Sequence, residues 1–99
     1  MRFKTFEQYD TYNGVARNHS KSLQEIISKI QEKGFELEDL YQTDSNISFN
    51  LSGRYPFSVT VAYDDATIIV EKDGITDNLG AFDINTELND IVEVITSFE

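Results

Sequence analysis

The feature that most constrains the fold of this chain is a pair of adjoining segments with strand-like patterns. Residues 56–63 read PFSVTVAY, with apolar side chains at every second position from Phe57 onward, and residues 66–71 read ATIIVE. Successive side chains of a β-strand point to opposite faces, so alternation predicts one apolar and one polar face. The two segments are therefore expected to be neighbouring strands of one sheet.

Asp64-Asp65 separates these two segments and predicts a two-residue turn between antiparallel strands. Aspartate tolerates the left-handed backbone geometry that such turns use, although Asn-Gly is commoner. The turn sets a register in which one face is apolar and the other is mostly polar. The expected pairs are Val61 with Ile68, Val59 with Val70, Thr60 with Ile69, and Ser58 with Glu71.

Three further segments complete the expected sheet. Residues 46–51 alternate clearly, whereas residues 35–41 carry a weaker strand signal. A second turn signal, Asp73-Gly74, precedes residues 75–82, which we expect to form a fifth strand broken near Gly80. A meander of four to five antiparallel strands is therefore predicted.

An amphipathic helix is predicted from Ser22 to Lys33, because apolar side chains recur at the spacing of one helix face. Ser22 and Glu25 match a capping box at its start, and Gly34 matches a helix stop. The apolar stripe consists of Leu23, Ile26, Ile27 and Ile30.

The C-terminal segment predicts a second amphipathic helix, with its start uncertain by one turn. Asp83, Asn85 and Thr86 are the three candidate N-caps. Its expected apolar face consists of Ile84, Leu88, Ile91, Val92 and Ile95.

The first 18 residues carry aromatic side chains at every third position from Phe3 to Tyr12, which predicts a short aromatic helix or an ordered arm. The length of 99 residues indicates one domain, spanning residues 1–99. The expected fold is α+β: an antiparallel meander with one face covered by the N-terminal-half helix and the C-terminal helix.

The charge of the chain is unevenly distributed. The formal net charge is −10. Residues 1–54 hold eight acidic and seven basic residues, whereas residues 55–99 hold ten acidic residues and one basic residue, Lys72. Direct binding to nucleic-acid phosphates requires a basic footprint, so we expect no direct contact with DNA or RNA.

The chain contains no cysteine, which excludes thiol catalysis, disulfides and cysteine-based metal sites. The N-terminus has no apolar signal-peptide region, and no apolar run reaches the length of a membrane span. A cytoplasmic protein without a membrane association is therefore expected.

Motifs for catalysis or cofactor binding are weak. His19 is the only histidine and is expected to be a surface or capping residue, since no nucleophile motif accompanies it. Asp73, Asp77 and Asn78 are oxygen ligands, but their spacing does not match a calcium-binding loop. No glycine-rich phosphate loop is present. We expect a non-enzymatic protein with no cofactor and no dedicated metal site.

The acidic second half is the remaining functional signal. Acidic residues three apart on the C-terminal helix would form a row rising about 4.5 Å per step. Two interpretations stay open: a solvated surface, or a surface that faces a basic partner. The candidate partner-binding residues are Asp64, Asp65, Glu71, Asp73, Asp77, Glu87, Asp90 and Glu93.

The leading expectation is a small inhibitor that occupies the basic nucleic-acid-binding surface of another protein, such as a nuclease. Small phage inhibitors of restriction or CRISPR nucleases are proteins of this type, acting as DNA mimics. The alternative is an immunity protein or a secretion-type chaperone that holds its partner through an apolar face. A homodimer is compatible with either expectation.

Overall fold

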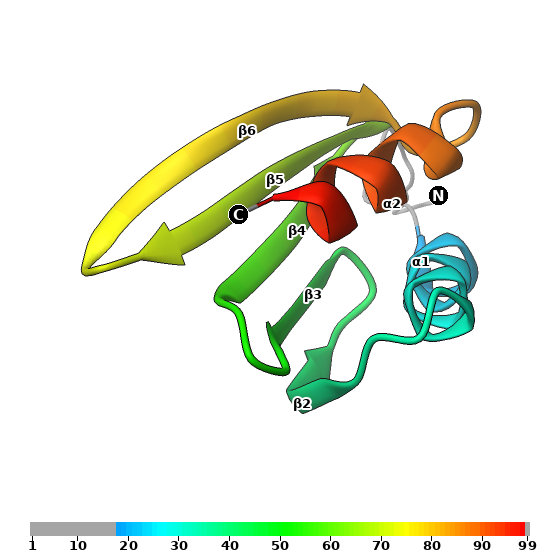
Figure 1. The fold of residues 1–99 in the computed structure, drawn as a ribbon. Coiled ribbons are helices and arrows are strands. Elements are labelled where there is room, and N and C mark those ends of the chain that lie inside the picture. The colour runs from blue at the N-terminus through cyan, green and yellow to red at the C-terminus, as the bar shows by residue number, and fades with distance from the viewer. Residues whose placement is uncertain (1–17, 99) are drawn as a thin grey trace, which may run out of the picture.

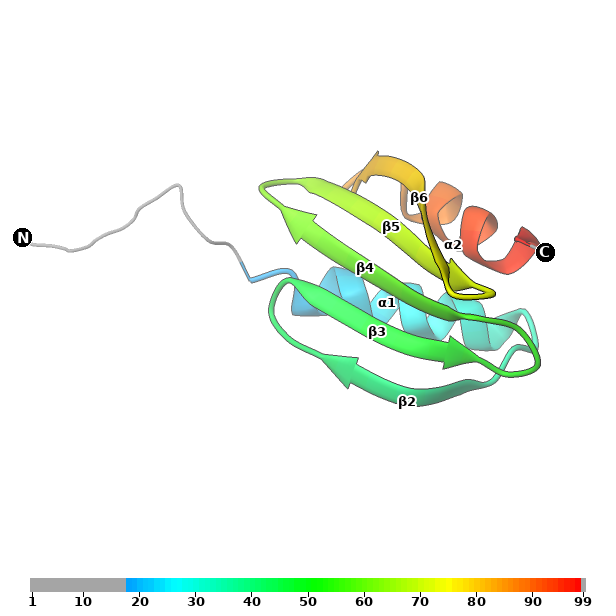
Figure 2. The ribbon, with the colours of Figure 1, turned by 90° about the vertical axis from the view of Figure 1, so that its left-hand side faces the viewer.

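The protein forms a five-stranded antiparallel sheet with two helices on one face (Figures 1 and 2). The structure is a computed structural model and describes residues 18–98. The aromatic helix or arm expected over residues 1–18 therefore lies outside the described residues, except for its last residue, Asn18. The predicted α+β meander is confirmed. Its elements are α1 (Ser20–Glu32), β2 (Leu37–Gln42), β3 (Asn46–Leu51), β4 (Pro56–Ala62), β5 (Asp65–Lys72), β6 (Ile75–Asp83) and α2 (Leu88–Ser97).

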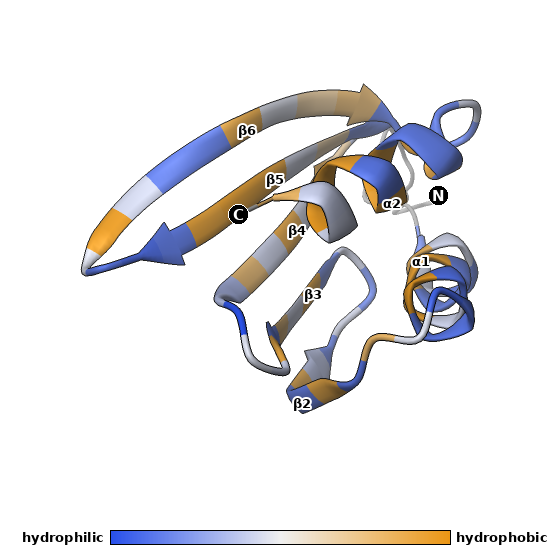
Figure 3. Ribbon diagram, viewed as in Figure 1, coloured by the Kyte–Doolittle hydropathy of each residue, from blue (hydrophilic) through white to orange (hydrophobic). Residues whose placement is uncertain are grey.

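The core lies between the sheet and the two helices. The sheet curves around α1 and α2, which contact each other, and leaves its other face uncovered by any described element (Figures 1 and 2). Apolar residues recur along the strands and along both helices (Figure 3). The apolar stripe predicted for the first helix is fully buried, and the strands contribute residues such as Ile47, Val59 and Ile68.

The register of the β4–β5 hairpin differs from the predicted one by two residues. Val59 pairs with Ile68 and Ala62 pairs with Asp65, so the turn is Tyr63-Asp64 and not Asp64-Asp65. Side chains alternate with a period of two, so a shift of two residues leaves the same side chains on each face. Both registers therefore satisfy the hydrophobic pattern. The predicted position of the turn was wrong.

Tyr63 adopts a backbone conformation that is unusual for its residue type. Its φ is 58°, in the left-handed region, and its side chain is 82% exposed. Left-handed backbone costs about 1–2 kcal/mol for most L-residues, and asparagine tolerates it better. We expect Tyr63→Asn to raise the free energy of unfolding by about 0.5–1 kcal/mol in urea denaturation.

A suitable control for this substitution is Tyr41→Asn. Tyr41 is also exposed, at 63%, but lies within β2 and has no positive φ. Asparagine is unfavourable in strands, so this variant should be slightly less stable than the unchanged chain. Equal changes in stability at both positions would contradict a specific strain at Tyr63.

Helix α1 begins two residues earlier than predicted, and the Ser22–Glu25 capping box is wrong. His19 occupies the N-cap position without a side-chain cap, while the Asn18 side chain accepts hydrogen bonds from the Ser20 backbone N–H and hydroxyl. The cause is tertiary: His19 is buried, its backbone N–H donates to Asp44 and its ring Nε2 donates to the Tyr63 carbonyl. The stop at Gly34, with φ of 95°, is as predicted.

None of the three predicted N-caps starts α2. The helix begins at Leu88, with Glu87 at the N-cap position. The Asp83 carboxylate instead caps a separate turn, accepting hydrogen bonds from the backbone N–H groups of Asn85 at 2.7 Å and Thr86 at 3.2 Å. Ile84 is buried in this turn and not on the helix, where the periodic pattern had put it.

The last strand is continuous where an interruption was expected. The ladder between β5 and β6 shifts register between Ile68 and Ile69, which marks a bulge beside Gly80. Gly80 has φ of 121°, a conformation open to glycine alone among common residues. Gly80 thus marks an irregularity in β6, as predicted, but the irregularity is a bulge within the strand and not its end. No helix among residues 18–98 is long and apolar enough to cross a membrane.

Candidate functional site

The eight acidic residues predicted to bind a partner lie in three separate parts of the fold. One group is at the β4–β5 turn, a second is at the end of the β5–β6 hairpin, and a third is on α2. The first group is Asp64 and Asp65, the second is Glu71, Asp73 and Asp77, and the third is Glu87, Asp90 and Glu93.

The turn group lies beside a further carboxylate. Asp65 is the cross-strand partner of Asp83 on β6, and like charges directly opposite each other are destabilising. The backbone of Asp64 is held in place, since its carbonyl accepts a hydrogen bond from Ile84 at 2.8 Å. This end of the sheet therefore combines a fixed backbone with concentrated negative charge.

The hairpin group does not share one face of the sheet. Glu71 follows the buried Val70 and so points to the uncovered face, whereas Asp77 pairs with Val70 and points to the helix side. Asp73 lies in the turn, with φ of 56°. Lys72, also on the helix side, lies over the Tyr55 ring, with its Nζ 5.3 Å from the ring centroid.

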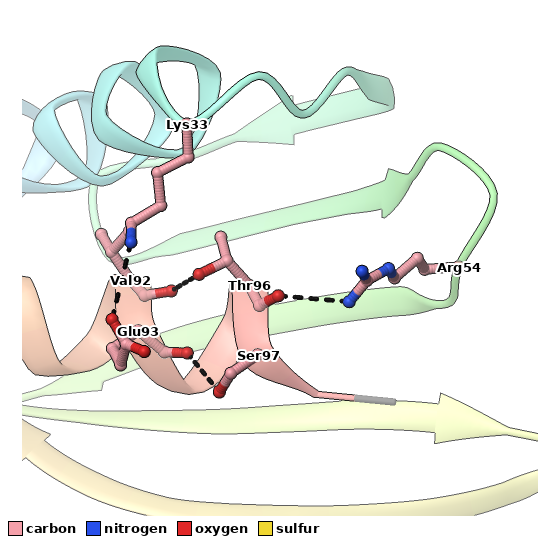
Figure 4. A network of polar contacts seen from close by, with 6 residues as sticks. All are labelled: Lys33, Arg54, Val92, Glu93, Thr96 and Ser97. Carbon is pink, nitrogen blue, oxygen red and sulfur yellow. Dashed lines mark hydrogen bonds and ion pairs between the residues drawn. The ribbon is translucent and has the colours of Figure 1, made fainter.

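The α2 group is partly committed to contacts within the protein. The Glu87 carboxylate accepts a hydrogen bond from the Asp83 backbone N–H at 2.8 Å. Glu93 pairs with Lys33, at the C-cap of α1, at 3.5 Å (Figure 4), and both side chains are well exposed. Asp90 is exposed on the same helix. The row predicted on this helix therefore contains one carboxylate that is paired with a neighbouring base.

Basic side chains are segregated from the uncovered face. Among residues 18–98 the lysines and arginines are Lys21 and Lys29 on α1, Lys33 at its C-cap, Arg54 in the turn between β3 and β4, and Lys72 on the helix side of β5. Arg54 Nη1 donates to the Thr96 carbonyl at 3.1 Å (Figure 4) and to the Phe98 carbonyl at 2.8 Å, at the C-terminus of α2. No described lysine or arginine points outward from the sheet.

The uncovered face consists of two acidic margins with uncharged rows between them. The paired registers place Tyr41, Ser48, Ser58, Ile69 and Asn78 in one row across all five strands. A second uncharged row holds Asn46, Thr60, Thr67 and Ala81. The outward acidic residues beyond these rows are Glu38, Asp39 and Glu71 at one end, and Asp65 and Asp83 at the other. The Asp39 carboxylate accepts a hydrogen bond from Nδ2 of the outward Asn50 at 2.9 Å.

A shallow groove of about 220 Å³ lies on this face. It is lined by Ser48, Pro56, Phe57, Ser58, Ile69, Glu71 and Thr76. A second groove, of about 370 Å³, lies between the helices and mixes both charge signs through Lys29, Lys33, Glu32 and Glu93. Within residues 18–98 no three histidine, aspartate or glutamate side chains gather in a way that could hold a metal ion.

Sequence reasoning missed three acidic residues of the uncovered face, Glu38, Asp39 and Asp83. Asp83 was treated as a helix cap, and its carboxylate does cap a turn. Glu38 lies in the weakest strand signal, where a register shift interrupts the ladder before Tyr41. The alternation around Leu37 could have assigned Glu38 to the polar face.

Comparison with known proteins gives no relative: no family model matches the sequence, no curated protein matches it, and no solved structure matches the fold.

Proposed function

We propose that this protein is a small non-enzymatic inhibitor that occupies the basic nucleic-acid-binding surface of a partner protein. Nucleases of restriction or CRISPR systems are the partners of this kind that best suit a compact acidic inhibitor. Its carboxylates would take the positions of phosphates, so the complex would exclude nucleic acid from the partner.

The observation that carries this proposal is the segregation of charge within the fold. The uncovered sheet face has carboxylates at both margins and no outward base among the described residues. Segregated like charges repel one another and lower stability, so a merely soluble surface gains nothing from this arrangement. A basic partner would turn the repulsion into attraction.

The competing function is a binder that uses an apolar face, as an immunity protein or a secretion-type chaperone would. Among residues 18–98 the exposed large apolar side chains are Leu40, Tyr41, Tyr63 and Ile75. They come from β2, the β4–β5 turn and the β5–β6 hairpin. This spread favours the acidic surface over an apolar one.

Salt dependence separates these two functions. The immobilised full chain should capture basic nucleic-acid-binding proteins from a cell lysate at about 50 mM salt and lose them at about 500 mM, where charges are screened beyond ~4 Å. Captured proteins would be identified by mass spectrometry. A partner retained at high salt, or one without a basic cleft, would support the apolar alternative and exclude the proposed function.

A further inference from the structure

We infer that the uncovered face of the sheet, and not helix α2, is the surface that enters the partner's cleft. This inference rests on the proposed function and names the part of the molecule that performs it. The occupant of this face is then a nucleic-acid-binding cleft with lysine or arginine on its two walls and an uncharged floor.

The first argument is the spacing of charge on this face. Glu71 lies six positions after Asp65 on β5, which corresponds to about 20 Å along the strand. The rows between them carry hydroxyl, amide and apolar groups only. A B-DNA groove likewise has two charged backbones beside a floor of uncharged hydrogen-bonding groups, although its major groove is only ~12 Å wide. The face thus repeats the order of groups that a cleft for DNA reads.

The second argument is that side chains in the two uncharged rows of the uncovered face are already held in place. Asn46 Nδ2 lies within hydrogen-bonding distance of Ser58 Oγ, at 3.1 Å, and Thr60 Oγ1, at 2.8 Å, across the β3–β4 pair. These short side chains are held by their neighbours, so little conformational entropy is lost when a partner covers them. The shallow groove beside Ile69 offers an apolar contact within the same uncharged rows.

The third argument is shape. Because the sheet curves around the helices, its uncovered face is convex (Figure 1). A convex surface fits a concave cleft better than a flat surface does. A second copy of the chain is a poor occupant, since both copies would bring acidic margins of the same sign and a convex surface.

Helix α2 is less suited to this contact. Glu93 is paired with Lys33, and Glu87 is bonded to the Asp83 backbone, so reaching a partner would break contacts within the protein. The helix layer also carries the lysines of α1, which would repel a basic cleft. The uncovered face carries no outward base among the described residues, although its Asp39 and Asp83 carboxylates accept hydrogen bonds within the protein.

Two variants of equal net charge test this inference. The margin variant is Glu38→Gln, Asp65→Asn and Glu71→Gln; the helix variant is Glu32→Gln on α1 with Asp90→Asn and Glu93→Gln on α2. All six side chains are exposed, and each variant removes three negative charges. The probes are a guide-loaded Cas9 nuclease, a type II restriction endonuclease and any protein recovered by the salt-dependent capture, with affinity and inhibition of DNA cleavage measured.

The expected result is a loss of affinity of at least ~10-fold for the margin variant and less than ~3-fold for the helix variant. Equal losses, or a larger loss for the helix variant, would overturn the inference while leaving the proposed function in place. If the unchanged chain binds none of the probes, the proposed function is overturned, and this inference with it.

Two tryptophan variants test the uncharged rows of the uncovered face independently of charge. Thr67→Trp places a bulky side chain on the uncovered face at a strand position that tolerates aromatic residues, and Ser28→Trp places one on exposed α1. Circular dichroism and urea denaturation would verify that both variants fold. Thr67→Trp should abolish binding to the probe that the unchanged chain binds, and Ser28→Trp should not. Full binding by a folded Thr67→Trp variant would overturn the inference.

Discussion

Replacing Ile68 with alanine should lower the free energy of unfolding by about 3 kcal/mol. Ile68 is fully buried in β5, between Val59 of β4 and Gly80 of β6. Isoleucine-to-alanine changes in protein cores cost ~2–5 kcal/mol, depending on how far the site collapses. Gly80 has no side chain that could move into the space. Because small domains are stable by only ~5–15 kcal/mol, this single change should produce a large shift in the urea midpoint.

The matched control is Ile75→Ala on the neighbouring strand. Ile75 is 64% exposed beside the turn at the end of the β5–β6 hairpin. Its replacement should change stability by less than ~0.5 kcal/mol. Similar losses at both positions would show that the core does not lie between the sheet and the helices as described.

Replacing Arg54 with alanine should lower the free energy of unfolding by about 2 kcal/mol. Its guanidinium donates to two carbonyls, those of Thr96 and Phe98, and its Cζ lies 5.2 Å from the centroid of the Phe35 ring. The last carbonyls of a helix have no partner within the helix, and charged donors there also suit the helix dipole. Hydrogen bonds to charged groups contribute ~1.5–3 kcal/mol.

Lys21→Ala provides the control for Arg54, because it removes the same charge from an exposed site on α1. Urea denaturation of this variant should lie within ~0.5 kcal/mol of the unchanged chain. The free energy of unfolding of Arg54→Lys should lie between those of Arg54→Ala and Lys21→Ala, since lysine keeps the charge but lacks the planar guanidinium group. A loss for Lys21→Ala as large as that for Arg54→Ala would assign the effect to net charge alone.

The faces of the sheet could be predicted from the sequence, but the hairpin register could not. Alternation assigned Val59 and Ile68 to the core, and both are buried there. The choice between two registers depended on which residue would accept a positive φ. Asp64-Asp65 is the better turn by residue preference, yet Tyr63 takes the strained position. Tertiary contacts explain this: the carbonyls of Tyr63 and Asp64 are held by His19 and Ile84.

The helix starts were misplaced for a related reason. Capping residues predict where a helix begins when local hydrogen bonds decide the matter. In α1 the start is fixed by contacts of His19 with two distant turns, and before α2 the best local cap, Asp83, serves a separate turn. Contacts between residues distant in sequence leave no local signal.

For the candidate site, the sequence indicated the sign of the charge but not its arrangement. The acidic row on α2 followed from helical spacing, yet the spacing could not indicate that Lys33 lies beside Glu93. The hairpin acids appeared as one cluster in the sequence. Strand alternation directs Glu71 and Asp77 to opposite faces, which is a distinction that requires the register.

The most direct test of the central claim is a competition between this protein and nucleic acid for one partner. The partner would be the protein recovered by salt-dependent capture, and its affinity for the full chain would be measured by equilibrium titration at increasing concentrations of duplex DNA. We predict that the apparent Kd rises in proportion to the DNA concentration, because the two ligands exclude each other. A ternary complex with an unchanged Kd would contradict the account.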